Sequence, residues 1–448
     1  MKKRAKILAG LLTLSMAVSL AGCGGANKET QTAPAADTAK EADAEEAALS
    51  EEPVADADTA ETVKITFWNM FGGGEGDFVD EIVNNFNESQ SEVEVEAIRL
   101  ESNEFYAKYG AALSAGKGPD VAVTHCDRLA PFVNSGQLAS LNDLAAQTGF
   151  EFSSISDLSM EAVTFNGEVY SVPLDTHFHM CYYNKDILKE AGKLKEDGTP
   201  DFGEISPEGL LTFLSEIKEA VPDKKPFCIN TPYFKEPFYN MYYEAGGELL
   251  NDDLSAAAIN NDKAAEVLRF FMNAYDSGLA DINDVNPWDT FAGGDSAIWF
   301  GGVWEAGNYF TEENGDRFGA IALPAFFGSD THWASSHGLT IPAYVEDGKK
   351  VAAMKFMAYF SAEGSKIWGK AGHVPAAKAI MESEEYLSLP YRDEFVKAQK
   401  TVKFAPQINN YNAVDTIIAE QMQQIIFGYT SIEDGLASIE TEINDLIQ

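Results

Sequence analysis

The chain is poor in cysteine and in basic residues. Its 448 residues include only four cysteines, and 71 aspartates and glutamates stand against 32 lysines and arginines, which gives a formal net charge of −39. So few cysteines exclude a disulfide framework, although one bridge among Cys126, Cys181 and Cys228 stays open. A strongly acidic surface repels phosphate groups, so we expect no nucleic-acid partner.

The N-terminus lacks an apolar stretch long enough to cross a membrane. Residues 7–20 are mainly apolar and follow four basic residues, whereas a spanning helix needs about 20 apolar residues. This pattern is typical of a secretory signal. The stretch ends in Leu20-Ala21-Gly22-Cys23, which resembles the bacterial lipobox and implies cleavage before Cys23 and diacylation of its thiol. We therefore expect a signal peptide at 1–22 and a lipid on Cys23 that anchors the mature protein to the outer face of the cell membrane.

The residues after Cys23 lack the means to form a core. Residues 24–60 contain no aromatic residue, only two large aliphatic residues (Leu49 and Val54), and ten acidic residues against two lysines. Such a segment buries too little apolar surface to offset the entropy of ordering it. We expect residues 23–60 to be a disordered acidic linker.

From residue 61 onward, strand and helix patterns alternate. Strands are expected at 63–68, 93–98 and 121–123, and apolar residues at helical spacing follow the first two. Further helices are expected at 209–220, 264–275, 351–360 and 414–427. This alternation predicts an α/β fold with mainly parallel sheets.

Motifs for nucleotide binding and covalent catalysis are missing. The glycine-rich residues 72–76 lack both the third glycine of a dinucleotide loop and the Gly-Lys ending of a phosphate loop. No Gly-x-Ser-x-Gly elbow and no papain-like cysteine pattern occur. We therefore expect no cofactor and no enzymatic activity.

Seven short segments follow one another in a characteristic order. They lie at 65–68, 116–121, 167–173, 182–186, 291–297, 301–304 and 372–376. The third reads G-x-x-Y-x-x-P, the fourth contains Y-N-K-D, and the sixth ends in G-x-W. In this order, behind a lipobox, they resemble the family 1 extracellular solute-binding proteins, the maltose-binding-protein-like receptors of sugar ABC transporters.

The resemblance implies a two-lobed periplasmic-binding-protein fold with the ligand in a cleft between the lobes. One lobe would comprise residues 61–175 and 338–370, and the other residues 176–337 and 371–448. The implied role is that of a monomer that captures a sugar, in particular an oligosaccharide, and delivers it to the permease of an ABC importer.

A sugar presents apolar C–H faces and a rim of hydroxyl groups, so its site needs aromatic platforms and planar polar groups. The resemblance places Asp127 and Arg128 at a ligand-binding pair, Trp304 at a stacking position and Tyr411 at a second aromatic position. The expected ligand-binding residues are Trp68, Phe71, Asp127, Arg128, Asp175, His177, Tyr233, Tyr239, Trp304 and Tyr411.

Three alternatives stay open. His177 and His179 would share one face of a strand, with His125 and Asp175 available, but spacing reveals no third convergent ligand, so no metal site is predicted. Carboxylates are numerous enough for a glycosidase pair, which makes a lipid-anchored glycan hydrolase the second interpretation. A peptide- or metal-binding protein of the same fold is the third.

Overall fold

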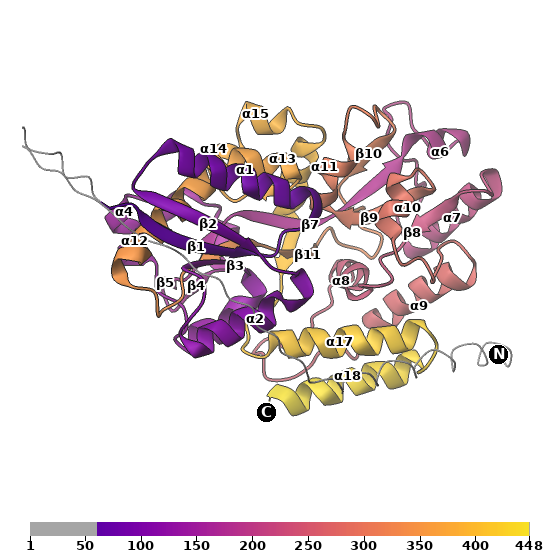
Figure 1. Ribbon diagram of the computed structural model, residues 1–448. Coiled ribbons are helices and arrows are strands. Elements are labelled where there is room, and N and C mark those ends of the chain that lie inside the picture. The colour runs from indigo at the N-terminus through magenta and orange to yellow at the C-terminus, as the bar shows by residue number, and fades with distance from the viewer. Residues whose placement is uncertain (1–60, 448) are drawn as a thin grey trace, which may run out of the picture. The chain divides into compact units, whose positions relative to one another are not determined.

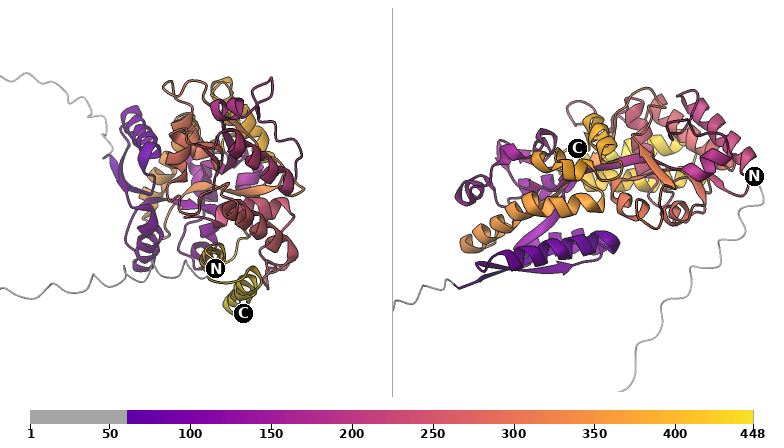
Figure 2. Two further views of the ribbon diagram at one scale, coloured as in Figure 1. Left: turned by 90° about the vertical axis from the view of Figure 1, so that its right-hand side faces the viewer. Right: turned by 90° about the horizontal axis from the view of Figure 1, so that it is seen from above.

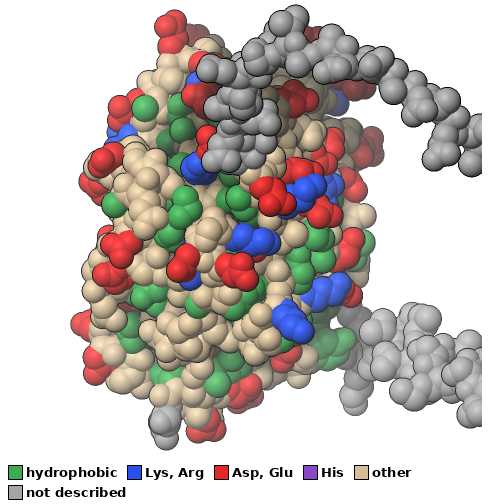
Figure 3. Space-filling model, turned by 60° about the vertical axis from the view of Figure 1, so that its left-hand side comes forward, with side chains coloured by type: hydrophobic (Ala, Val, Ile, Leu, Met, Phe, Trp, Pro, Cys, Tyr) green, Lys and Arg blue, Asp and Glu red, His purple; other side chains and the backbone are tan. Residues whose placement is uncertain are grey.

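The computed structural model describes residues 61–447. The expected signal peptide, Cys23 and the acidic linker lie outside the described residues. Within residues 61–447, none of the helices combines the length and the apolar character of a membrane span. Acidic and basic side chains are scattered over the face drawn in Figure 3, among uncharged ones.

The first sheet has the strand order β2-β1-β3-β12-β6. Its strands are β1 (Val63–Asn69), β2 (Val93–Arg99), β3 (Val121–His125), β6 (Val172–Pro173) and β12 (His337–Thr340). β1 pairs in parallel with β2 and β3, whereas β12 runs antiparallel to β3 and β6. The sheet therefore takes an interior strand from a much later part of the chain.

Helices cover the first sheet and form its core. They include α1 (Gly73–Ser89), α2 (Ser102–Ala115), α12 (Asp347–Tyr359) and α13 (Ser365–Ala371). α1 turns Val79, Ile82 and Phe86 inward at helical spacing. The orange α12 lies beside the indigo β1 despite its distance along the chain (Figures 1 and 2), and Phe356 of α12 meets Phe67 of β1 with ring centroids 5.2 Å apart.

The second sheet is built around β7 (Asp175–Asn184), whose ten residues are all buried. Its strand order is β14-β11-β7-β9-β8, and β10 and β13 also pair with β7. The other strands are β8 (Lys225–Cys228), β9 (Ser296–Gly302), β10 (Phe318–Ile321), β11 (His332–Ser335), β13 (Val374–Pro375) and β14 (Val402–Phe404). The helices of this core are α7 (Pro207–Ala220), α8 (Lys235–Glu244), α9 (Asp262–Asp276), α17 (Tyr411–Ile426) and α18 (Ile432–Ile447).

Shorter elements fill the connections. They are α3 (Leu129–Asn134), α4 (Asn142–Thr148), α5 (Asp157–Glu161), β4 (Thr164–Phe165), β5 (Glu168–Val169), α6 (Lys185–Glu190), α10 (Pro287–Ala292), α11 (Ala306–Tyr309), α14 (Lys378–Met381), α15 (Glu384–Leu387) and α16 (Arg392–Ala398). Cys126, Cys181 and Cys228 are buried and free.

The α/β fold class is confirmed, but the expectation of mainly parallel sheets is wrong. Parallel and antiparallel pairs occur in both sheets. The segments β6–β7 and β11–β12 each pass from one sheet into the other through a single residue, Leu174 and Ser336 respectively, and they run antiparallel to one another in both sheets. The lobe boundaries at 175, 337 and 370 stay a prediction.

Candidate functional site

A cavity of about 300 Å³ lies where elements of both sheets meet. From the first sheet, Phe71 follows β1, Tyr106 comes from α2, and Asp127 and Arg128 lie in the 3-10 turn Cys126–Arg128 that continues β3. These residues place one aromatic ring, one phenol and one charged pair on this side of the cavity.

Two tryptophans form the opposite side. Trp304 lies in the 3-10 turn Val303–Glu305 after β9, and Trp333 lies on β11. The Trp304 ring centroid is 5.7 Å from that of His177 and 5.5 Å from that of His179, and the Trp333 centroid is 5.6 Å from that of His179. The histidines of β7 therefore set the spacing of two partly exposed indole rings beside the cavity.

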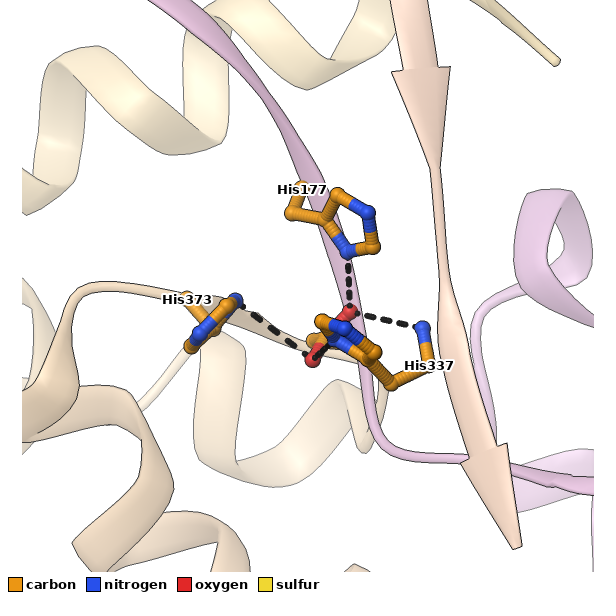
Figure 4. A group of neighbouring side chains, drawn as sticks. His177, His337 and His373 are labelled. Atoms are coloured by element: carbon orange, nitrogen blue, oxygen red, sulfur yellow. Dashed lines mark hydrogen bonds and ion pairs between the residues drawn. The ribbon is translucent and has the colours of Figure 1, made fainter. Parts of the chain in front are cut away.

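The floor of the cavity is organised by Asp175, the first residue of β7 (Figure 4). His177 donates from Nδ1 to Oδ1 over 3.0 Å, and His337 donates from Nδ1 to Oδ2 over 2.9 Å and from its backbone N–H to Oδ1 over 3.1 Å. The indole N–H of Trp368 donates to Oδ2 over 2.7 Å. The Asp175 side chain has no solvent exposure, so its charge is balanced entirely by these donors.

The electrostatics of the floor follow from burial and from this carboxylate. Burial alone would raise the pKa of Asp175, but the nearby His337 and His373 and the donated hydrogen bonds lower it well below its usual value. Burial lowers the pKa of His177 to about 4. Burial opposes protonation of His337 as well, yet Asp175 raises the pKa of that ring. Asp175 is thus ionised, and His177 is a neutral ring.

His373 completes the floor from the loop that precedes β13. Its Nε2 lies 2.7 Å from Oε1 of Glu75, and its ring stacks on Trp368 with centroids 4.3 Å apart and an interplanar angle of 4°. Its Nδ1 lies 3.5 Å from Oδ2 of Asp175 and is buried without a hydrogen-bond partner.

A charged group borders the cavity beside α8. Arg128 lies 3.8 Å from Asp127 and 3.4 Å from Asp415 of α17, and its guanidinium stands 5.5 Å from the centroid of the Tyr106 ring. Lys235 also binds Asp415. Burial raises the pKa of Asp127, whose Oδ1 is buried without a hydrogen-bond partner.

Glu236 lies on the same side, with Oε2 3.6 Å from Nε2 of His179. Burial raises the pKa of its carboxyl group to about 7. His179 in turn accepts from the side-chain amide of Asn240 over 2.6 Å, and burial lowers its pKa to about 3. This edge of the cavity therefore combines a neutral imidazole with a carboxyl group that titrates near neutrality.

The structure brings together half of the residues expected from the sequence. Phe71, Asp127, Arg128, His177 and Trp304 line the cavity, and Asp175 lies directly behind its floor. The other four do not line the cavity. Trp68 packs against the first core, Tyr233 is 57% exposed on the surface, and Tyr239 and Tyr411 are buried.

Several cavity residues were missed. Those not expected from the sequence are Met70, Glu75, Ser102, Tyr106, His125, Lys235, Glu236, Trp333, Ser335, His337 and His373. His337 lies at an expected crossing between lobes and His373 within the 372–376 segment, so both positions carried a signal. Nothing near Trp333 in the sequence distinguishes it from a tryptophan of the core.

A second hollow of about 620 Å³ lies away from this site. It is lined by charged side chains such as Lys185, Asp186 and Arg317 and by no aromatic residue. Leu194 is its one large apolar side chain, so it offers little to a bound organic molecule. The cavity between the sheets is therefore the candidate functional site.

Known proteins share this architecture. Residues 81–392 match the family described as bacterial extracellular solute-binding protein. The maltodextrin-binding protein MdxE of Bacillus subtilis is 24% identical over 388 residues, which cover 83% of this chain and 86% of that protein. The maltooligosaccharide ABC transporter solute-binding lipoprotein of Streptococcus pneumoniae is 25% identical over 332 residues, covering 67% and 70%. The maltose-bound structure of T. maritima MalE3 superposes with a TM-score of 0.77 at 20% identity, covering 86% of this chain and all of that one.

Proposed function

The chain belongs to the bacterial extracellular solute-binding proteins, and we propose that it captures an oligosaccharide outside the cell and delivers it to the permease of an ABC importer. The observation that carries the proposal is the pair of tryptophans, Trp304 and Trp333, beside a polar cavity to which both sheets contribute. The sugar-binding relatives MdxE and the streptococcal lipoprotein support the same substrate class.

The chemistry of the cavity suits a neutral sugar. Indole rings offer apolar faces for the C–H surface of a pyranose ring. Arg128, Asp127, Lys235 and Glu236 surround the same cavity and supply donors and acceptors for hydroxyl groups. A volume of about 300 Å³ lies at the lower end of the range of ligand pockets, which favours a short oligosaccharide.

Calorimetric titration of the purified chain tests this proposal. A panel of neutral gluco-, manno-, xylo- and chito-oligosaccharides should include at least one that binds with a micromolar or lower Kd. Trp333→Ala should weaken that binding, because it removes one indole platform. A chain that binds no member of the panel, or a Trp333→Ala variant with unchanged affinity, would contradict the proposed site.

One observation favours a second candidate, a glycan hydrolase. A carboxyl group whose pKa is raised by burial, as in Glu236, is typical of a general acid in glycosidases. We prefer binding without cleavage because the family consists of solute-binding proteins. Prolonged incubation with the bound glycan, followed by chromatography, should return intact ligand. Products that accumulate with turnover and vanish in Glu236→Gln would favour the hydrolase.

We also propose that Cys23 carries the lipid that holds the mature protein on the outside of the membrane. The basic start, the apolar stretch and the Leu20-Ala21-Gly22-Cys23 ending support it, as does the lipoprotein among the relatives. Mass spectrometry of the mature N-terminus should find a diacylated Cys23. An unmodified Cys23, or an N-terminus elsewhere, would contradict the anchor.

A further inference from the structure

We propose that Asp175, His177, His337 and His373 bind a divalent transition-metal ion at the floor of the cavity. One ligand atom from each of these four buried residues lies within 4.8 Å of all the others. Imidazole nitrogens with one carboxylate oxygen are a ligand set that Zn²⁺ and its neighbours in the first transition row prefer.

The spacing suits a four-coordinate ion. Bonds of about 2.0–2.2 Å to a central zinc place the ligand atoms of a tetrahedron about 3.3–3.6 Å apart. The Asp175 oxygens lie 3.0 Å from Nδ1 of His177, 2.9 Å from Nδ1 of His337 and 3.5 Å from Nδ1 of His373. The four ligand atoms, all within 4.8 Å of one another, therefore lie close to the spacing of a coordination shell.

His373 supplies the independent observation. Its Nδ1 is buried without a hydrogen-bond partner, while its Nε2 is held 2.7 Å from the carboxylate of Glu75. The ring holds Nε2 on Glu75 and presents Nδ1 to the carboxylate of Asp175, 3.5 Å away. A cation between these two atoms would serve as a partner for both.

The surroundings of the four residues resemble the outer shell of a metal site. Metal-binding histidines commonly donate their second nitrogen to a carboxylate, as His373 does to Glu75. Trp368 holds the Asp175 carboxylate from behind, with its N–H 2.7 Å from Oδ2, and stacks on the His373 ring. Both partners hold the ligand side chains in place.

The ligands are accessible from one side only. His177, His337 and His373 line the cavity, whereas Asp175 has no exposure. An ion would enter through the cavity and lose its remaining water against the floor. Coordination through Nδ1 requires the neutral His177 ring to carry its proton on Nε2, and a protonated histidine must lose a proton before it binds the ion, so binding weakens as pH falls.

This site goes beyond the proposed sugar binding, and its test has its own readout. The full chain, purified without a histidine tag and dialysed against a chelator, is titrated with Zn²⁺ and with Co²⁺. Calorimetry should show one ion per chain with a Kd in the micromolar range or below, and Co²⁺ should develop the intense visible absorption of a four-coordinate complex. Zinc should also raise the Tm.

The decisive variants are Asp175→Asn and His373→Gln. Each removes one ligand, so each should weaken zinc binding by at least about tenfold. His332→Gln is the matched control, because His332 is also a buried histidine bound to a carboxylate, Glu244 at 3.1 Å, but lies outside the group of four. It should bind zinc as the native chain does.

Circular dichroism shows whether each variant is folded. If Asp175→Asn does not fold, the zinc affinity of His373→Gln alone tests the proposal. A native chain that binds no stoichiometric zinc, or variants that bind it as tightly as the native chain does, would overturn the proposal. Sugar binding measured on the same native sample distinguishes this failure from a failure of the proposed function.

Discussion

The Nη2 atom of Arg128 lies 3.4 Å from Oδ2 of Asp415, and this ion pair joins the end of a first-sheet strand to helix α17 of the other core. Asp415 also binds Lys235 and accepts a hydrogen bond from Tyr239 over 3.1 Å. A single carboxylate thus neutralises two cations beside the cavity. The contact between the first sheet and α17 therefore has an electrostatic component.

Replacing Asp415 with asparagine should destabilise the protein. Arg128 and Lys235 are only about one-fifth exposed, at 19% and 21% of their side chains, so both would keep a partly buried charge with a weakened partner. We expect a loss of roughly 2–3 kcal/mol in the free energy of unfolding, measured by urea titration. Asp316→Asn is the control, because Asp316 pairs with Lys185 while 89% exposed, and it should change the value by less than about 1 kcal/mol. Equal effects of the two variants would contradict the bridging role.

Replacing Trp304 with alanine should mainly reduce ligand affinity, whereas replacing Trp299 with alanine should mainly reduce stability. Trp304→Ala removes a platform from the cavity, so ligand affinity should fall by at least about 30-fold, which corresponds to about 2 kcal/mol, with little change in the Tm without ligand. Trp299 lies on β9 with 3% exposure, so Trp299→Ala should lower the Tm markedly because a core cavity is left behind. Calorimetry and thermal unfolding measure the two effects. A Trp304→Ala variant that loses stability but keeps its affinity would show that the ring serves packing.

Ligand binding should draw the two lobes together. A sugar that contacts Arg128 on one side and Trp304 on the other binds a closed arrangement more tightly than an open one, and shifts the population accordingly. Small-angle scattering of residues 61–448 should show a smaller radius of gyration at saturating sugar. An unchanged profile would mean that occupancy leaves the shape of the protein unaltered, so the permease would have to recognise the ligand in another way.

The contribution of His179 to stability should decrease between pH 6.5 and pH 4. In the unfolded chain a histidine takes up its proton near pH 6.5, whereas burial lowers the pKa of His179 to about 3 in the folded protein. The unfolded state therefore binds more protons in this window, and each such group lowers the free energy of unfolding by about 1.4 kcal/mol per pH unit. Glu236 opposes the trend, because burial raises its pKa to about 7 and its folded form binds more protons. His179→Asn should flatten the decrease, as measured by urea titrations across the range, and an unchanged slope would contradict the assignment.

Local patterns predicted the elements well because helix and strand periodicity reports which face is buried. The helices expected at 209–220, 264–275 and 414–427 are found at 207–220, 262–276 and 411–426. Strand direction was predicted poorly, because it depends on how the chain crosses between sheets. β12 enters the first sheet antiparallel to β3, and no local pattern encodes that pairing.

The functional site was likewise predicted in part: residues in or near family-like segments were found, and residues brought together by folding were not. Trp304 lies in a segment that resembles one of a known family, and Asp127 and Arg128 follow another such segment, so their shared cavity followed from the resemblance. At the floor, Asp175 is hydrogen-bonded to His337 and Trp368, which lie 162 and 193 positions after it in the chain. The sequence pattern suggested His177 and His179 as neighbours on one strand face, whereas in the structure His177, His337 and His373 surround the carboxylate of Asp175. Convergence over such separations is a property of the folded chain alone.

The insertion of β12 between β3 and β6 has a consequence for export. In a chain exported as the proposed signal peptide implies, the first sheet cannot close until β12 (His337–Thr340) has crossed the membrane, by which time strands β7 to β11 of the second sheet are already outside. An interior gap in the sheet leaves unpaired backbone groups and apolar surface on β3, so neither lobe can reach its native form as an independent N-terminal unit. Contacts of such long sequence separation also make folding slow. If the chain is exported unfolded, as the proposed signal peptide implies, this dependence keeps the first sheet incomplete until residue 340 of 448 has passed through.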